Sequence, residues 1–145
     1  MSQVSKPSTD TFLALQLNHT EILPLFEQAN NWQERYRQIM LLGKSIPKLD
    51  NDFKLESAQV KGCESSAWLY HQEIEKKHYF LGDSDARVVK GLIGLLLVAC
   101  NGKTGTEITA FDIDKYFDKL GLTGQLSPSR TNGLFALAKA MKAVV

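Results

Sequence analysis

The sequence predicts an α+β fold in which a short antiparallel sheet of about three strands packs against several helices. Helical patterns precede and follow two neighbouring segments that are rich in β-branched and aromatic residues, so helices and strands do not alternate along the chain. A short polar link separates these two segments, which is typical of a β-hairpin. After them comes a segment, 85–100, that is apolar all round and predicts a central buried helix.

Two helices are predicted before the sheet. The first covers 20–29, and a stronger one begins near Asn31. The residues that recur at steps of three and four in the second helix are Trp32, Tyr36, Ile39, Met40 and Gly43. This spacing gives one buried stripe, and Gly43 and Pro47 end the helix. Residues 1–19 carry few such signals, so we expect a loose N-terminal segment followed by one domain over 20–145.

The hairpin is predicted from residues 66–74 and 77–81, which flank the polar link Glu75-Lys76. Residues 58–60 are expected to begin a further strand. Pairing about the link sets side chains of the two strands next to each other. The predicted neighbours are Trp68 with Leu81, Tyr70 with Tyr79 and, on the opposite face, His71 with His78.

Helical patterns return after the hairpin. Asp83 or Ser84 can cap the helix over 85–100, because both side chains accept hydrogen bonds from free backbone N–H groups. The chain then breaks at Asn101-Gly102. Further helices are predicted over 106–109, over 113–120 and from Ser127-Pro128 to the C-terminus.

Composition and charge exclude several classes of protein. The 145 residues are 43% hydrophobic and 23% charged, which is a globular balance for one domain. The net charge of +1 gives no support for nucleic-acid binding. The apolar stretch 12–17 is too short for a signal peptide, and 92–100 is about half of the roughly 20 residues that span a membrane. Two cysteines do not make a disulfide scaffold, so we expect reduced thiols in a cytoplasmic protein without membrane contact.

Cys63 is the candidate for chemistry. It follows Gly62, whose backbone can turn with positive φ, and it precedes a predicted strand. A thiol on a tight turn at the start of a strand can reach another molecule. From the residues alone, a buried small side chain and a nucleophile are equally good interpretations of Cys63. Cys100 ends an apolar run and is expected to serve packing.

Four motifs occur in the order found in a known family. One of them, Gly62-Cys63-Glu64-Ser65 followed by Trp68, resembles the cysteine loop of the SufE/CsdE family. The other three are the helix around Trp32, Glu34, Tyr36 and Leu42-Gly43-Lys44, the block Gly82-Asp83-Ser84-Asp85 with Val89-Lys90-Gly91-Leu92, and Leu126-Ser127-Pro128-Ser129-Arg130 with Gly133-Leu134. The match spans roughly 30–140, and the spelling is closer to the CsdE branch than to the SufE branch. Ala67 departs from the family pattern, where a larger aliphatic residue is expected; this touches packing and leaves the chemistry intact.

The resemblance implies a SufE/IscU-like fold and a role as sulfur acceptor. Such a protein takes persulfide sulfur from a cysteine desulfurase of the SufS/CsdA type, here onto Cys63, and stimulates that enzyme. It then delivers the sulfur to a downstream acceptor for iron–sulfur cluster assembly or a related transfer. The chain would act as an accessory protein rather than an independent enzyme, and it would hold no cofactor, since pyridoxal phosphate belongs to the desulfurase. Monomer and homodimer both stay open.

Six other residues are expected to shape the cysteine loop or the surface that docks the partner: Gly62, Glu64, Ser65, Asp83, Asp85 and Arg130. A sulfur acceptor needs a thiolate, which is the minority form of a free cysteine near neutral pH. Lys61 and Arg130 would favour the thiolate, whereas Glu64 would disfavour it. We therefore expect activation to come largely from the desulfurase.

Other interpretations stay open at this point. His71, His78 and Cys63 could form an open zinc site, although two histidines side by side on an exposed sheet face are the favoured interpretation and no metal is expected. Asp83 and Asp85 could be an acid–base pair, but capping explains them as well. At the level of the whole protein, the alternatives are an IscU-like metal or cluster scaffold and an interaction module in which the thiol is incidental.

Overall fold

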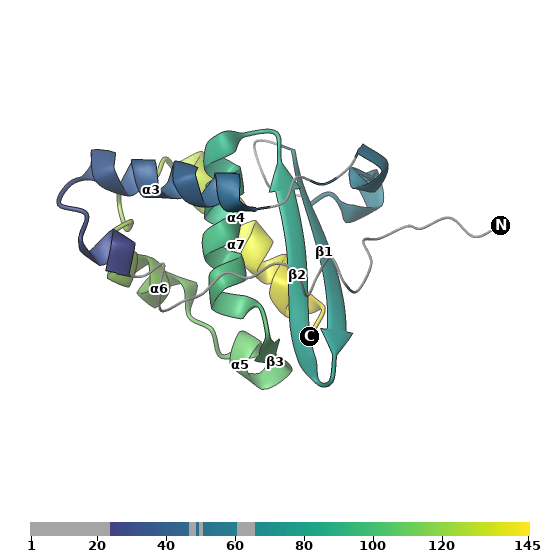
Figure 1. Cartoon of the computed structure of the whole chain (residues 1–145). Coiled ribbons are helices and arrows are strands. Elements are labelled where there is room, and N and C mark those ends of the chain that lie inside the picture. Colours follow the sequence, from purple (N-terminus) through teal and green to yellow (C-terminus); the bar gives the residue numbers. More distant parts are fainter. Residues whose placement is uncertain (1–23, 47–48, 50, 61–65) are drawn as a thin grey trace.

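The structure, a computed structural model, describes residues 24–46, 49, 51–60 and 66–145 (Figure 1). Its sheet is built on two long antiparallel strands, β1 (Ala67–Ile74) and β2 (Lys77–Ser84). A short strand, β3 (Lys103–Thr104), pairs antiparallel with β2, so that the order is β1-β2-β3. The predicted class, α+β with a short three-stranded antiparallel sheet, is confirmed.

The hairpin turn is the predicted two-residue link. Glu75 and Lys76 have φ of 52° and 68°, the left-handed conformation that matches the twist of two-residue hairpins. The turn sets Ile74 opposite Lys77, and every later pair follows from it. The observed partners are Trp68 with Asp83, Tyr70 with Leu81 and His71 with Phe80. The predicted pairs were therefore wrong by two residues, but an even shift keeps each side chain on its predicted face.

The third strand is also not where the sequence placed it. Residues 58–60 contribute one isolated bridge, between Gln59 and Trp68, and part of this segment forms the 3-10 turn Glu56–Ala58. A second 3-10 turn covers Asn51–Phe53. These residues lie along the outer face of the hairpin, where Lys54 stands 5.3 Å from the ring centroid of Trp68. The segment before the hairpin thus covers the sheet instead of extending it.

The helices agree closely with the prediction: α3 (Trp32–Ser45), α4 (Arg87–Cys100), α5 (Gly105–Thr109), α6 (Ile113–Leu120) and α7 (Pro128–Ala143). Of the first predicted helix, residues 24–27 are described and helical. Asn31 caps α3 and Ser127 caps α7, each through a side-chain oxygen that accepts a backbone N–H. α6 ends at Gly121, whose φ of 74° suits glycine.

The start of α4 differs from the prediction. Its N-cap is Ala86, which offers no side-chain acceptor, and the strand β2 continues through Asp83 and Ser84. The interpretation of Asp83 or Ser84 as the N-cap was therefore wrong: both residues belong to the sheet, and Ser84 accepts an N–H from Ala86 before the helix and not from its first turn.

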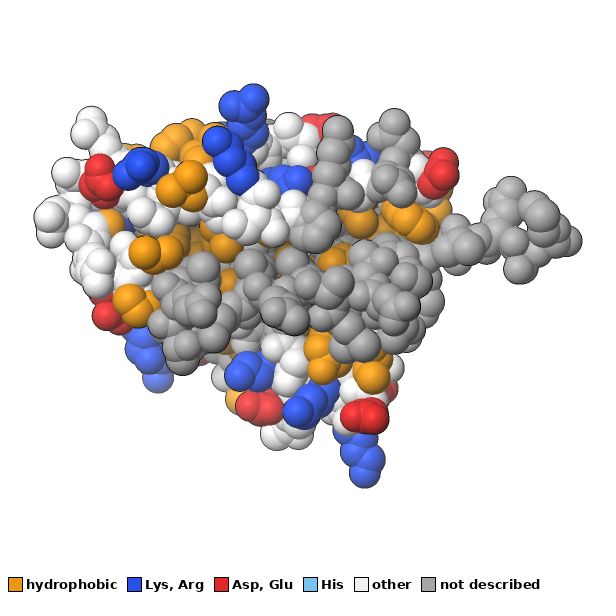
Figure 2. Space-filling view, viewed as in Figure 1, with side chains coloured by type: hydrophobic (Ala, Val, Ile, Leu, Met, Phe, Trp, Pro, Cys, Tyr) orange, Lys and Arg blue, Asp and Glu red, His pale blue; other side chains and the backbone are white. Residues whose placement is uncertain are grey.

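The surface shows where charged and apolar side chains meet. In Figure 2, Lys and Arg side chains stand beside apolar ones along the upper edge, over α3. The exposed large apolar side chains of the described residues are Leu25, Tyr36, Leu41, Leu55, Phe135 and Val144. No helix among the described residues has the length and apolar character to cross a membrane.

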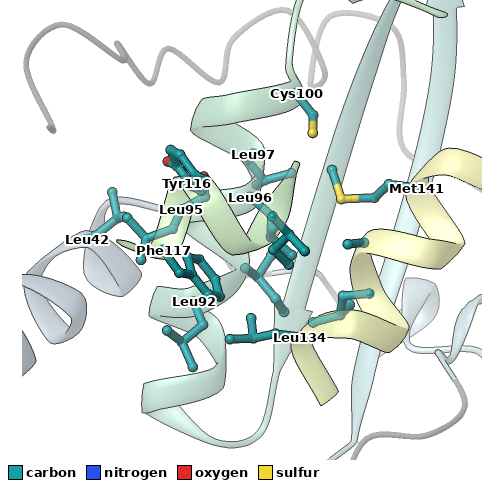
Figure 3. Close-up of a cluster of buried hydrophobic side chains, with 14 of the residues drawn as sticks. Leu42, Leu92, Leu95, Leu96, Leu97, Cys100, Tyr116, Phe117, Leu134 and Met141 are labelled. Atoms are coloured by element: carbon teal, nitrogen blue, oxygen red, sulfur yellow. The ribbon is translucent and has the colours of Figure 1, made fainter. Parts of the chain in front are cut away.

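The core is organised around α4, which packs against β2, α3 and α7 (Figures 1 and 3). Its leucines Leu92, Leu95, Leu96 and Leu97 are at most 1% exposed. Each such side chain stabilises the fold by about 1.5–3 kcal/mol relative to exposure. The inner face of the hairpin packs against α4, and a smaller cluster of Leu49, Trp68, Tyr70 and Leu81 covers the outer face. Both faces of the hairpin are thus buried.

The approach of α3 to α4 depends on a glycine. A Cβ on Gly91 would lie 2.1 Å from the carbonyl oxygen of Ile39, so no other residue fits there without moving a helix. Gly43 faces the same crossing from α3, and a Cβ there would lie 3.0 Å from the nitrogen of Gly91. The second half of α3 and the first half of α4 are therefore in close backbone contact.

Candidate functional site

The predicted reactive residue lies outside the described part of the chain. Cys63 and its neighbours Gly62, Glu64 and Ser65 all fall in the segment 61–65, which the structure does not describe, and so does Lys61. The structure describes the residues on either side of that segment, Val60 and Ser66.

The residues that flank the Cys63 segment are both tied to the start of the hairpin. On one side, the backbone N–H of Val60 donates to the carbonyl oxygen of Ala67 at 2.9 Å. On the other side, the carbonyl oxygen of Ser66 accepts from the Oγ of Ser84 at 2.6 Å and from the N–H of Asp85 at 3.2 Å. The chain therefore leaves for Cys63 and returns from it at the same end of the sheet.

Ser84 is the residue that joins the returning chain to α4. Its hydroxyl donates to Ser66, and the same oxygen accepts the N–H of Ala86 at 3.2 Å. Ala86 is the N-cap of α4, so one hydroxyl links the end of the Cys63 segment, the end of β2 and the start of the helix. Sequence reasoning missed this role. A signal was present, because a serine between a strand and a helix can bond to backbone on both sides.

Asp83 is buried, and both of its carboxylate oxygens accept hydrogen bonds. Its side chain is 2% exposed. One carboxylate oxygen accepts the N–H of Leu49 at 3.0 Å, and the other accepts the N–H of Ser84 at 2.8 Å. The ammonium group of Lys90 lies 3.3 Å from the second oxygen. Asp83 thus fastens the outer segment, β2 and α4 to one another, and it has little capacity left for acid–base work.

Asp85 and Arg130 are placed differently. The side chain of Asp85 is exposed, so the structure does not bring it together with the buried Asp83 as a pair. Arg130 is half-buried in the first turn of α7, where its backbone N–H donates to the Oγ of Ser127 at 3.3 Å. Its guanidinium forms no ion pair with any described residue. Both residues remain available to a partner at the surface.

A groove begins at Val60, the last described residue before the Cys63 segment. It has a volume of about 530 Å³ and runs between the hairpin and α7. The lining is mostly apolar and small: Ala58, Gln59, Val60, Leu69, Ala136, Lys139, Ala140, Ala143 and Val144. The described surface next to this end of the segment is therefore an apolar hollow.

Cys100 has the environment of a packing residue, as predicted. It is 2% exposed, and Figure 3 shows it pointing into the same interior as Met141. Burial raises the pKa of its thiol to about 11, although Lys142 and Lys103 act in the opposite direction. At neutral pH this thiol stays protonated and inert.

The two histidines contact each other, but not on an exposed face. Nε2 of His71 lies 2.7 Å from Nδ1 of His78, and their rings stack with centroids 5.0 Å apart. His78 is buried on the face that packs against the helices, so the exposed-face interpretation was wrong. Each ring uses one nitrogen in this contact, and that nitrogen is not available to a metal ion. Among the described residues no group of three metal-binding side chains exists, and a site that includes Cys63 lies outside them.

Comparison with known proteins gives the family. Residues 20–145 match the SufE family, described as an Fe-S metabolism associated domain. The chain is 42% identical to the sulfur acceptor protein CsdE of Escherichia coli over 80% of each chain. It is 37% identical to the cysteine desulfuration protein SufE of Wigglesworthia glossinidia brevipalpis, over 81% of this chain and 82% of that protein.

A solved structure supports the fold. The solution structure of a hypothetical protein from Thermus thermophilus matches with a TM-score of 0.66 at 20% identity, and the match covers 86% of this chain and 90% of that one. The higher identity to CsdE than to SufE supports the CsdE branch. From its motifs, its fold and the match over 20–145, the chain belongs to the SufE family.

Proposed function

We propose that this chain is a sulfur acceptor. It takes persulfide sulfur from a cysteine desulfurase onto Cys63, raises the turnover of that enzyme and delivers the sulfur for iron–sulfur cluster assembly or a related transfer. Two similar proteins are named as a sulfur acceptor and a cysteine desulfuration protein, and the family is described by iron–sulfur metabolism. These names support a desulfurase as the partner.

The observation that carries the proposal is the state of Cys100. Sulfur transfer needs a thiolate that another protein can reach. Cys100 is buried, and with a pKa of about 11 it is ionised at pH 7 to only about one part in ten thousand. The chain has two cysteines, so the chemistry falls to Cys63, within the motif that resembles the family's cysteine loop.

The transfer is an exchange between sulfur atoms. The Cys63 thiolate attacks the terminal sulfur of the persulfide on the desulfurase, and a new S–S bond forms at Cys63. The S–S bond of the donor breaks, and its cysteine leaves as a thiolate. No external oxidant or reductant is needed, because the sulfur keeps its oxidation state. Pyridoxal phosphate acts earlier, on the desulfurase, and this chain requires no cofactor of its own.

The described residues on either side of the segment suit this role. Hydrogen bonds hold Val60 and Ser66, on the two sides of the segment, at the start of the hairpin. The two described flanks of the segment therefore lie at the same end of the sheet. The apolar groove that begins at Val60 offers shelter from water to a persulfide, which is easily oxidised or reduced. Glu64 disfavours a thiolate, so we assign most of the activation to the desulfurase site.

Mass spectrometry tests the proposal. The protein is incubated with a cysteine desulfurase loaded with pyridoxal phosphate and with free cysteine, and is then digested without reductant. The expected result is one or more added sulfur atoms, about 32 Da each, on the peptide that holds Cys63. Cys63→Ser should abolish the addition and the stimulation of the desulfurase.

Cys100→Ala is the matched control, since it removes the other thiol and should keep both signals. Sulfur on the Cys100 peptide, or full stimulation by Cys63→Ser, would show that Cys63 is not the carrier. The second of these outcomes would favour an interaction module in which the thiol is incidental.

A further inference from the structure

We propose that a basic groove between α3 and α4 receives acidic side chains of the sulfur-donating desulfurase. The groove has a volume of about 370 Å³ and is lined by Met40, Gly43, Lys44, Arg87 and Lys90. The inference rests on the proposed function, because it takes a desulfurase as the partner, and it adds a docking surface and the chemistry of what docks there.

The groove has a defined shape because two helices meet at a glycine contact. A Cβ on Gly43 would lie 3.0 Å from the backbone nitrogen of Gly91 and 3.4 Å from the carbonyl oxygen of Arg87. The second half of α3 and the first half of α4 therefore pack closely and form the two walls of the groove. Lys44 stands on the first wall and Arg87 on the second.

The charge of the groove is largely uncompensated. Its lining includes three cationic side chains and no Asp or Glu. Lys90 pairs with Asp83, whereas Lys44 and Arg87 are exposed and form no ion pair with any described residue. The first turn of α4 holds no acidic residue that could neutralise Arg87. A carboxylate entering the groove would accept charge-assisted hydrogen bonds from the lysine and the arginine.

An apolar ridge on α3 leads to the groove and points to a protein rather than to a free anion. Trp32, Tyr36, Met40 and Lys44 follow one another at steps of four and so share one face of the helix. Tyr36 is 40% exposed, and its ring meets that of Trp32 at 5.8 Å between centroids. Figure 2 shows apolar and basic side chains next to each other over α3. Aromatic and arginine side chains are enriched in surfaces that bind proteins.

The position of the groove points to the sulfur donor. Arg87 follows Ser84 by three residues, and Ser84 holds Ser66 at the end of the Cys63 segment. Asp83, which pairs with Lys90 in the groove, precedes Ser84. A protein that docks over Ser66 and the start of α4 therefore also meets the groove. Electrostatic complementarity at such a rim speeds association and orients the partner.

Charge reversal tests the inference. The variant Lys44→Glu with Arg87→Glu changes the two unpaired cations and leaves the Lys90–Asp83 pair intact. The rate of sulfur transfer from the desulfurase is measured against the concentration of this protein. We expect KM to rise about tenfold or more, with little change in kcat, because docking is weakened and the chemistry is not. Added salt should raise KM of the native protein more than KM of the variant.

A matched control carries the same change in net charge elsewhere. Lys115→Glu with Lys119→Glu reverses two exposed lysines on α6 and should leave KM unchanged. Thermal unfolding and circular dichroism check that all variants are folded. Should the reversed pair fail to fold, Lys44→Gln with Arg87→Gln removes the charges more gently and should still raise KM several-fold.

Several results would overturn the groove as a donor site. KM could be the same for the native protein and the groove variant, or it could rise equally in the α6 control. The variant could accept sulfur normally but hand it on more slowly, which would assign the groove to the downstream acceptor. Inorganic phosphate could stabilise the native protein and not the variant while KM is unchanged, which would make it a small-anion site. If instead the native protein takes up no sulfur at all, the sulfur-acceptor proposal itself fails.

Discussion

The two ends of α4 are built from opposite kinds of contact. At its C-terminal end, Cys100 is buried among apolar side chains, and burial raises the pKa of the thiol to about 11. At its N-terminal end, Asp83 and Ser84 form a polar network with Leu49, Ser66, Ala86 and Lys90. One helix thus holds an inert cysteine at one end and an anchor of the Cys63 segment at the other. The difference teaches that the same helix can bury a thiol in an apolar core at one end and carry a polar network at the other.

The largest expected loss of stability is at the polar, N-terminal end of α4. Asp83→Ala leaves the ammonium group of Lys90 without its partner and the N–H of Leu49 without an acceptor. We expect the free energy of unfolding to fall by about 3–5 kcal/mol, as is typical when one partner of a buried ion pair is removed. Denaturation by urea measures it. Asp85→Ala, two residues on and exposed, should cost less than about 0.5 kcal/mol. Equal losses would refute a special role for Asp83.

The contact between α3 and α4 comes next. Gly91→Ala places a Cβ 2.1 Å from the carbonyl oxygen of Ile39, and backbone cannot yield as a side chain can. We expect a loss of about 3 kcal/mol in unfolding free energy. Gly94→Ala is the comparison, because its Cβ would meet the side chains of Ile46 and Leu42 instead. A larger loss at Gly94 than at Gly91 would contradict this ranking.

The pH dependence of stability tests the apolar, C-terminal end of α4. The folded pKa of Cys100, about 11, lies above its usual value near 9.0, so the folded state keeps a proton that the unfolded state releases. This contribution to stability is complete below pH 9 and is lost as the pH rises toward 11, by about 2 kcal/mol. The unfolding free energies of the native protein and of Cys100→Ala, measured from pH 8 to 11, should show a steeper fall for the native protein. Parallel curves would mean that the thiol is not shielded.

The smallest expected effect concerns the anchor itself. Ser84→Ala removes the hydrogen bonds to Ser66 and Ala86, and we expect a loss of about 1–2 kcal/mol. Hydrogen exchange at the amides of Asp85 and Ala86 should become faster. Ser129→Ala, at an exposed position of α7, is the control and should change neither quantity. Unchanged exchange in Ser84→Ala would show that this hydroxyl does not hold the segment.

Much of the fold could be predicted because its signals are local. The two-residue turn at Glu75 and Lys76, the caps Asn31 and Ser127 and the apolar pattern of α4 each depend on residues close together in the chain. The burial of Cys100 followed from the same apolar run. For the site, the sequence singled out Cys63 through its motif, and that choice stays a prediction since the segment lies outside the described residues.

The sequence by itself determined the α+β class, the hairpin, the helices and the burial of Cys100, because hydrophobic periodicity and turn chemistry act over a few residues. Only the tertiary structure decided the burial of His78 and the hydrogen bonds and ion pair of Asp83. It also decided the link through Ser84 and the convergence of Lys44 and Arg87 on one groove. Their partners come from distant parts of the chain, and such contacts exist only after α3, α4 and the sheet have packed together.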